Sequence, residues 1–331
     1  MVKKYVNHLI QLIWLIIQDL FNLKKNEFRI FIPYNKHPFW KTYFSHPPIK
    51  YLKTKYFSKI YHSHNLIPAG YKGYYITDVE HILHLSGHSR DYKKMVESAE
   101  WIEEQLNNSR CKAIILPTDG AKREVLKYLK HPESIEKKLV KIFPSFQTKP
   151  AKKKEFFQER VINILFIGNK FWGKGTPIAI RVFENLRNRF KDDITFTLVC
   201  NDIPPTFKMP REINVISNQK LTESLRDELY GNAHLFLFPC LHDSFGVYLE
   251  ALAYGVPVLT TKIYDKDEIV IHNKTGYLFD TPISLYDGNF GYDYRSWSDF
   301  IGLIKESWFI PPKKLIIITF WNRCHRSVVE P

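Results

Sequence analysis

The chain has 331 residues, 44% of them hydrophobic, which is enough for two α/β domains of modest size. Its 48 basic and 34 acidic residues give a net charge of +14, so an anionic partner is favoured over a cationic one. Its four cysteines are widely spaced and form no C-x-x-C pair, which argues against a disulfide scaffold or zinc module and indicates a reduced, cytoplasmic protein.

The positive charge is concentrated in the first half of the chain. Residues 1–150 carry 25 basic and 13 acidic side chains, a net +12, whereas residues 151–331 carry 23 and 21, a net +2. This excess favours contact between the first half and an anionic membrane or a lipid diphosphate. A general lysine bias of the source proteome is the alternative explanation. Nucleic acid is not expected as a partner, because the sequence has no nucleic-acid-binding motif.

The first predicted element is a helix over residues 6–23, VNHLIQLIWLIIQDLFNL. Its longest unbroken apolar run, Leu12 to Ile17, is too short to cross a bilayer, and no small-residue cleavage site follows it. Lysine pairs on both sides suit an interfacial helix, while packing into the first domain's core fits equally well. We expect a cytoplasmic protein with peripheral contact to the inner face of the membrane.

The rest of the first half alternates between apolar runs and helical patterns. Predicted strands cover residues 28–33, 74–76, 113–116 and 139–143, and predicted helices cover 92–107 and 120–129. This alternation is typical of a Rossmann-like α/β domain. Residues 144–160, PSFQTKPAKKKEFFQER, contain two prolines and a lysine run, and are predicted to form the linker. We therefore divide the chain into domains 1–150 and 151–331.

His81 is the candidate for chemistry in the first domain. It lies just after a predicted strand end, where the catalytic groups of α/β domains collect. Its imidazole could bind a substrate hydroxyl or exchange a proton with it, and a packed, satisfied histidine is the equal alternative. His81, His84 and His88 have helical spacing, but Gly87 interrupts that helix, so we expect no metal site.

The second domain opens with a strand, a glycine-bearing loop and a helix over residues 161–190. The loop, GNKFWGKG, runs from Gly168 to Gly175 and contains Asn169, Lys170 and Lys174. Fixed cations in such a loop can stabilise the negative charge of a departing diphosphate without a metal ion. A solvated surface lysine is the simpler interpretation of this loop when it is taken alone.

A second strand, loop and helix over residues 234–254 precede a further strand. Ser244, Phe245 and Gly246 open the helix, where glycine permits close approach of a ligand and the first N–H groups favour a phosphate. Glu250, one turn further in, can accept hydrogen bonds from neutral hydroxyls. A carboxylate beside a phosphate-binding helix start indicates a nucleotide site.

These two segments resemble the nucleotide-sugar site of retaining glycosyltransferases with the GT-B fold, glycosyltransferase family 4 (glycosyl transferases group 1). Gly168, Lys174 and Gly175 match the family's Gly-Arg-(four residues)-Lys-Gly loop, with Asn169 at the arginine position and Lys170 beside it as a substitute. The resemblance covers roughly residues 160–280.

The second segment is similar to the family's pair of glutamates. Glu250 stands at the second glutamate and is followed by the matching Ala251. The spacing assigns the first glutamate to His242, while alignment on Phe245–Gly246 assigns it to Asp243. We prefer Asp243, because a carboxylate can accept from sugar hydroxyls.

The resemblance implies an α/β GT-B protein, with two Rossmann-like domains facing each other across a cleft. Residues 1–150 would be the acceptor side and residues 151–331 the donor-binding side. It implies a retaining, metal-independent, hexosyltransferase-type enzyme that moves a sugar from a UDP- or GDP-linked nucleotide sugar to a glycan or lipid-linked acceptor, with no other cofactor. The alternatives are a degenerate GT-B protein that only binds nucleotide or glycan, and a sugar-nucleotide epimerase.

The resemblance also implies the role of each site residue. Lys174 and Lys170 would stabilise the departing diphosphate, together with the N–H groups at Phe245–Gly246. Glu250 would bind the ribose and Asp243 the donor sugar. The acceptor hydroxyl would attack on the face from which the nucleotide leaves, so that no side-chain nucleophile is needed.

Overall fold

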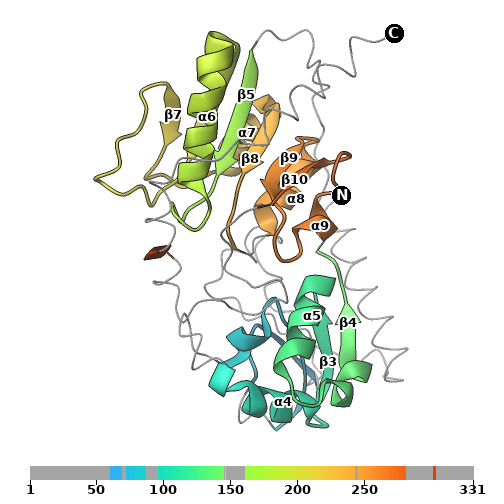
Figure 1. Ribbon diagram of the computed structural model, residues 1–331. Coiled ribbons are helices and arrows are strands. Elements are labelled where there is room, and N and C mark those ends of the chain that lie inside the picture. Colours follow the sequence, from blue (N-terminus) through green and yellow to red (C-terminus); the bar gives the residue numbers. More distant parts are fainter. Residues whose placement is uncertain are drawn as a thin grey trace. The chain divides into compact units, whose positions relative to one another are not determined.

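The computed structural model describes residues 60–68, 72–86, 96–144, 146, 161–242, 245–280 and 301–302 (Figure 1). The helix predicted over residues 6–23 and the strand predicted over residues 28–33 lie outside this part of the chain. Within the described residues, no helix has both the length and the apolar character needed to span a bilayer.

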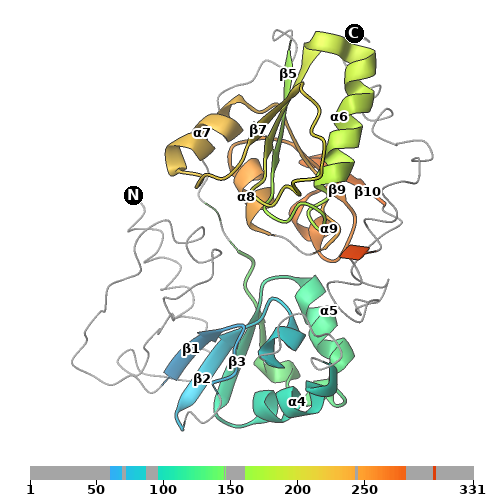
Figure 2. The same cartoon turned by 90° about the vertical axis from the view of Figure 1, so that its left-hand side faces the viewer.

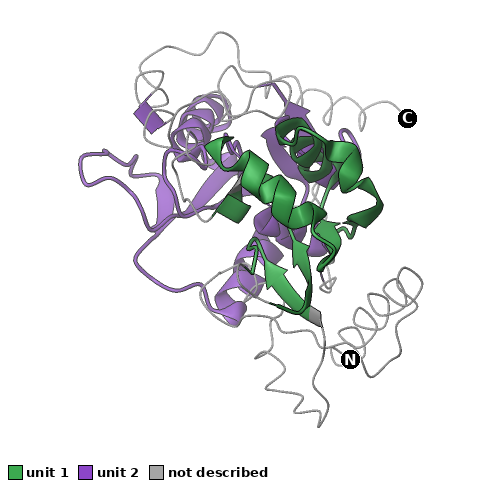
Figure 3. Cartoon of the chain, turned by 90° about the horizontal axis from the view of Figure 1, so that it is seen from below, with its two compact units in different colours: residues 1–89, 93–143 green, residues 90–92, 144–331 purple. Residues whose placement is uncertain are grey.

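The chain divides into two compact units (Figure 3). Unit 1 comprises residues 1–89 and 93–143, and unit 2 comprises residues 90–92 and 144–331. The division falls at the start of the segment 144–160, whose prolines and lysines suggested a linker.

Unit 1 is built on a four-stranded parallel sheet in the order β1-β2-β3-β4. Its strands are β1 (Ile60–His64), β2 (Tyr74–Asp78), β3 (Cys111–Leu116) and β4 (Leu139–Lys141). Its helical segments are η2 (Ile82–Ser86), α4 (Ala99–Asn107), α5 (Asp119–Tyr128), η3 (Pro132–Ser134) and η4 (Glu136–Lys138). The strands predicted around residues 74, 113 and 139 are confirmed, whereas β1 was not predicted.

Local sequence explains where the helices of unit 1 begin and what they bury. The Thr118 side chain accepts a hydrogen bond from the Ala121 N–H at 3.1 Å, which caps the first turn of α5. Ala121 and Val125 then face the interior of the unit. Because α5 follows β3 directly, its first turn lies at the carboxyl end of the sheet, where α/β domains place their functional groups.

Unit 2 is built on a six-stranded parallel sheet in the order β10-β9-β8-β5-β6-β7. Its strands are β5 (Ile162–Ile167), β6 (Ile194–Val199), β7 (Ile213–Ile216), β8 (Leu235–Phe238), β9 (Val258–Thr261) and β10 (Gly276–Phe279). Its helices are α6 (Thr176–Phe190), η5 (Lys191–Asp193), α7 (Glu223–Asn232), α8 (Gly246–Ala253) and α9 (Lys266–Ile269). Figure 2 shows α6, α7 and α8 lying against this sheet.

The strand order of unit 2 reverses between β5 and β8, which are neighbours in the sheet. From β5 the chain passes through α6 to β6 on one side, and from β8 it passes through α8 to β9 on the other. The connections that follow these two strands therefore leave the carboxyl edge in opposite directions along the sheet. Open α/β sheets bind their ligands at such a point of reversal. Both segments that carry the predicted site residues lie here.

Candidate functional site

The loops that follow β5 and β8 are joined to each other. The Leu241 N–H donates to the Gly173 carbonyl at 3.1 Å. Gly175 has a φ of +74°, and a Cβ on it would lie 2.0 Å from the Pro239 carbonyl oxygen. Both the backbone conformation and the close approach therefore require glycine at position 175. This contact fixes the lysine-bearing loop against the segment that leads to α8.

The cationic side chains of the first loop differ in exposure. Asn169 and Lys170 are exposed, whereas Lys174 is half-buried. The Lys174 ammonium lies 6.0 Å from the centre of the Phe238 ring, at the last residue of β8. Gly168 lies against the same ring, since a Cβ on Gly168 would come within 2.9 Å of a Phe238 ring atom. The structure thus places the Lys174 charge at the junction of β5 and β8.

Two helices begin at this edge, and neither has a side-chain cap among the described residues. α6 follows Gly175 and has proline in its first turn, while α8 begins at Gly246 after Phe245. A Cβ on Gly246 would meet nothing within 4 Å in the part of the chain that the structure describes. Uncapped first turns and this open space suit the approach of a phosphate group. Asp243 and Ser244 lie outside the described residues, so their predicted roles stay predictions.

Glu250 is held inside unit 2 by two donors that the sequence did not suggest. The carboxylate is 5% exposed. Its Oε1 atom accepts a hydrogen bond from Nη1 of Arg226 at 2.7 Å, and its Oε2 atom accepts from the Tyr230 hydroxyl at 3.1 Å. Burial raises the pKa of Tyr230 well above its ordinary value, and the charge of Glu250 raises it further. The phenol is therefore protonated and acts as the donor.

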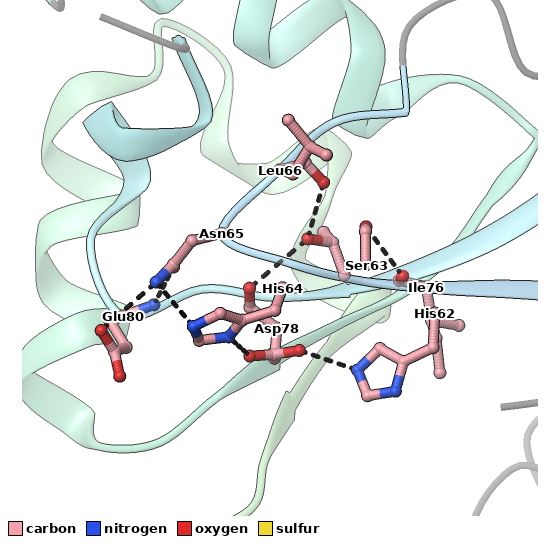
Figure 4. A network of polar contacts seen from close by, with 9 residues as sticks. His62, Ser63, His64, Asn65, Leu66, Ile76, Asp78 and Glu80 are labelled. Atoms are coloured by element: carbon pink, nitrogen blue, oxygen red, sulfur yellow. Dashed lines mark hydrogen bonds and ion pairs between the residues drawn. The ribbon is translucent and has the colours of Figure 1, made fainter. Parts of the chain in front are cut away.

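Unit 1 contains a polar cluster at the carboxyl ends of β1 and β2, in which Asp78 lies between two imidazole rings (Figure 4). His62 Nε2 lies 2.7 Å from Asp78 Oδ1, and His64 Nδ1 contacts Asp78 Oδ2. Asn65 joins the cluster to Glu80, because its Nδ2 atom donates to Glu80 Oε2 at 3.2 Å. No role was predicted for His62, His64, Asn65 or Asp78.

His64 and Asp78 have shifted pKa values. Burial alone raises the pKa of Asp78, but the hydrogen bonds from His62 and His64 lower it by more. Burial likewise lowers the pKa of His64, and Asp78 raises it by more, so the net shift is upward. The cluster therefore favours an ionised Asp78 beside a protonated His64.

His81 lies in the interior of unit 1, with only 2% of its surface exposed. Its Nδ1 atom lies 2.9 Å from Oε2 of Glu124, a buried carboxylate of α5, and its ring makes an edge contact with His84. This is the packed arrangement that the sequence analysis weighed against a catalytic one. The catalytic role of His81 stays a prediction.

No metal site was predicted for His81, His84 and His88, because Gly87 interrupts the helix that would align them. Among the residues that the structure describes, no group of three or more His, Cys, Asp or Glu side chains could hold a metal ion. His88, which the helical spacing associated with His81 and His84, lies outside them.

Comparison with known proteins locates the relationship in unit 2. Residues 147–285 match the family described as Glycosyl transferases group 1. The lipopolysaccharide glucosyltransferase WaaG of Escherichia coli K12 is 27% identical over 137 residues, which are 40% of this chain and 37% of WaaG. TarM of S. aureus superimposes with a TM-score of 0.50 at 14% identity, over 75% of this chain and 47% of TarM.

The chain thus spans less than half the length of WaaG and of TarM. The matched residues 147–285 include the Lys174 loop, the start of α8 and the Glu250 carboxylate. Both units are α/β with parallel sheets, and the structural likeness to TarM confirms the predicted fold class. The chain therefore has the GT-B type of α/β fold, and its residues 147–285 match the glycosyl transferases group 1 family.

Proposed function

We propose that this protein is a glycosyltransferase that uses a UDP- or GDP-linked sugar, retains the anomeric configuration and requires no metal ion. The observation that supports this best is the convergence in unit 2 of a lysine-bearing loop, a helix start with no side-chain cap among the described residues, and a buried carboxylate. All three lie at the edge where the strand order reverses. The family match over residues 147–285 supports the same class of reaction.

The diphosphate of the donor is assigned to the β5–α6 and β8–α8 loops. Negative charge grows on the diphosphate as the bond to the sugar breaks, so fixed positive groups stabilise the transition state more than the bound donor. Lys174 supplies one such charge, with Lys170 as the more exposed second one. The first N–H groups of α8, at Phe245–Gly246, add their dipoles.

The remaining roles are those that the resemblance to the family implies. Glu250 accepts hydrogen bonds from the ribose, and Asp243 accepts from the donor sugar. The acceptor hydroxyl attacks the anomeric carbon on the face from which the diphosphate departs. The bond between that carbon and the phosphate oxygen breaks, and this oxygen takes the hydroxyl proton. His81 would act on the acceptor side as a hydrogen-bonding or proton-exchanging group.

The acceptor is proposed to be a glycan or a lipid-linked glycan. WaaG, which is similar to part of this chain, is a lipopolysaccharide glucosyltransferase. The net charge of +12 on residues 1–150 suits a phosphate-bearing acceptor or an anionic membrane. On this proposal the protein works in the cytoplasm, with peripheral contact to the inner face of the membrane.

The direct test is turnover of nucleotide sugars by Lys174→Ala, with Lys274→Ala as the control. Lys274 is an exposed lysine that precedes β10, and it has no proposed part in the reaction. Loss of Lys174 should lower kcat on the order of a hundredfold, as removal of a transition-state donor does in other enzymes. Release of diphosphate should require an acceptor and should survive EDTA.

The assay also separates the alternatives. An epimerase would convert the nucleotide sugar without an acceptor, and a degenerate binding protein would bind it without turnover. Turnover by Lys174→Ala equal to that of the wild type would contradict the assignment of this loop to the leaving group.

A further inference from the structure

Helix α7 presents two donors to the Glu250 carboxylate. Arg226 and Tyr230 are four residues apart and therefore lie on one face of α7. Each donates to a different oxygen of Glu250, at 2.7 Å and 3.1 Å. With both oxygens bound, the carboxylate is fixed in position and in rotation. The guanidinium also supplies the counter-charge that a buried carboxylate needs.

A second contact between α7 and α8 supports this pair. The Tyr254 ring stacks on the Tyr230 ring, with centroids 5.2 Å apart and planes 17° apart. The Tyr254 hydroxyl donates to the carboxylate of Asp227, next to Arg226. Tyr230 is fully buried, so its hydroxyl has little freedom to leave Glu250. The α7 face formed by Arg226, Asp227 and Tyr230 thus contacts α8 at Glu250 and, just after the end of α8, Tyr254.

This arrangement orients the carboxylate, because each of its oxygens has a donor of its own. A carboxylate can accept about four hydrogen bonds in all, and Arg226 and Tyr230 supply two of them. Two adjacent hydroxyls, such as the 2′ and 3′ hydroxyls of a ribose, match the pair of oxygens that it presents. The Arg226 side chain is 29% exposed, whereas that of Glu250 is only 6% exposed.

We infer that Arg226 and Tyr230 are positioning residues that hold Glu250 for recognition of the ribose of the donor nucleotide. This inference rests on the proposed function, because it presumes that unit 2 binds a nucleotide. It assigns to α7 a part in discriminating ribose from 2′-deoxyribose. The mechanism is geometric: a carboxylate that can rotate accepts from the 2′ hydroxyl less well than one that is held.

The test measures the affinity of the full chain for UDP, GDP, ADP and CDP and for their 2′-deoxy counterparts by isothermal titration. The wild type should bind one of the ribonucleotides more tightly than its 2′-deoxy form, on the order of tenfold, since one hydrogen bond to a charged group is lost. In Arg226→Gln this ratio should fall toward one, mainly through weaker binding of the ribonucleotide. Tyr230→Phe removes a single hydroxyl and should lower the ratio in the same direction.

Two further variants test whether the change in the affinity ratio is specific to the donors of Glu250. Arg189→Gln removes an exposed arginine near the far end of α6 and should leave the ratio unchanged. Arg226→Lys keeps the charge but loses the planar fork, and should give an intermediate ratio. The melting temperature of each variant without nucleotide shows whether it folds. If Arg226→Gln does not fold, Tyr230→Phe decides the question.

The outcomes separate the inference from the proposed function. Equal weakening of the ribonucleotide and its 2′-deoxy form would show a purely structural role for α7 and would overturn the inference alone. An unchanged ratio in Tyr230→Phe and Arg226→Gln would overturn it as well. A wild-type chain that binds none of the four diphosphates would overturn the proposed function, and the inference with it.

Discussion

At the scale of single residues, two glycines of unit 2 have different explanations: one is required by the fold, and the other is explained by the binding of a ligand. Gly175 has a positive φ and lies against the Pro239 carbonyl, so the fold itself requires glycine. Gly246 has ordinary backbone angles and open space around its Cα among the described residues. Nothing in the described part of unit 2 accounts for glycine at this position, whereas close approach of a diphosphate to the start of α8 would.

This difference predicts opposite effects for two alanine substitutions. Gly175→Ala should lower the free energy of unfolding by about 2 kcal/mol or more, through backbone strain and the clash with Pro239. Gly246→Ala should leave stability within about 0.5 kcal/mol of the wild type but weaken nucleotide binding about tenfold, or 1.4 kcal/mol. Denaturant unfolding and titration with diphosphates measure the two quantities.

A third glycine is the control for this comparison. Gly231, in α7, also has nothing within 4 Å of an added Cβ among the described residues, and Gly231→Ala should change neither binding nor, beyond a slight gain, stability. Unaltered nucleotide affinity in Gly246→Ala would show that no ligand group approaches the start of α8.

Polar contacts between residues distant in sequence explain which site residues could not be predicted. The partners of Glu250, Arg226 and Tyr230, lie 24 and 20 positions earlier in the chain. In a sequence, an arginine and a tyrosine four residues apart on a helix are ordinarily assigned to its solvent-exposed face. Glu250 itself could be predicted, because the motif that contains it is contiguous in sequence, from the strand before it to the strand after it. The packing of His81 against Glu124 depends on a contact across 43 positions, which spacing alone does not reveal.

At the scale of secondary structure elements, strands with unbroken apolar runs were predicted and β1 was not. β5 and β8 contain INILFI and LFLF, whose buried faces follow directly from composition. β1 reads IYHSH, and the alternation of its two histidines with Ser63 does not indicate a buried strand. His62 and His64 are accommodated because Asp78 of β2 satisfies both rings.

The Asp78 cluster predicts that the stability of unit 1 depends on pH. Asp78 has a lowered pKa in the folded state, so its contribution is present above the ordinary value of 3.8 and is lost as the pH falls through the folded pKa. His64 has a raised pKa, so its contribution is present below 6.5 and is lost as the pH rises through the folded pKa. Both contributions are therefore complete between about pH 4 and 6.5.

We expect the free energy of unfolding to fall by about 1 kcal/mol as the pH rises from 6 through the folded pKa of His64. His64→Gln should flatten this part of the profile, and Asp78→Asn should flatten both limbs. Glu80 and His62 face the same cluster and remain in both variants. Denaturant titrations across the pH range measure the effect. A decline of equal size in His64→Gln would assign the dependence to other groups.

At the scale of the whole molecule, the sequence predicted the alternation of strands and helices and a Rossmann-like fold for unit 2. It also indicated that the Lys174 loop and the Glu250 helix follow strands of that sheet. The adjacency of β5 and β8 required the structure, because strand order depends on how six strands pair and not on any one of them. This adjacency brings together two loops about seventy residues apart and converts two separate motifs into one candidate site.

The central claim, that unit 2 binds the diphosphate of a nucleotide sugar, is tested most directly by thermal unfolding of the full chain. UDP, GDP, ADP, CDP and their sugar conjugates would be compared, first without metal and then with magnesium. A ligand that binds only the folded state raises the melting temperature by mass action. We predict a rise with a UDP- or GDP-type ligand that needs no metal and is lost in Lys174→Ala but kept in Lys274→Ala. An unchanged melting temperature with every nucleotide would contradict the claim.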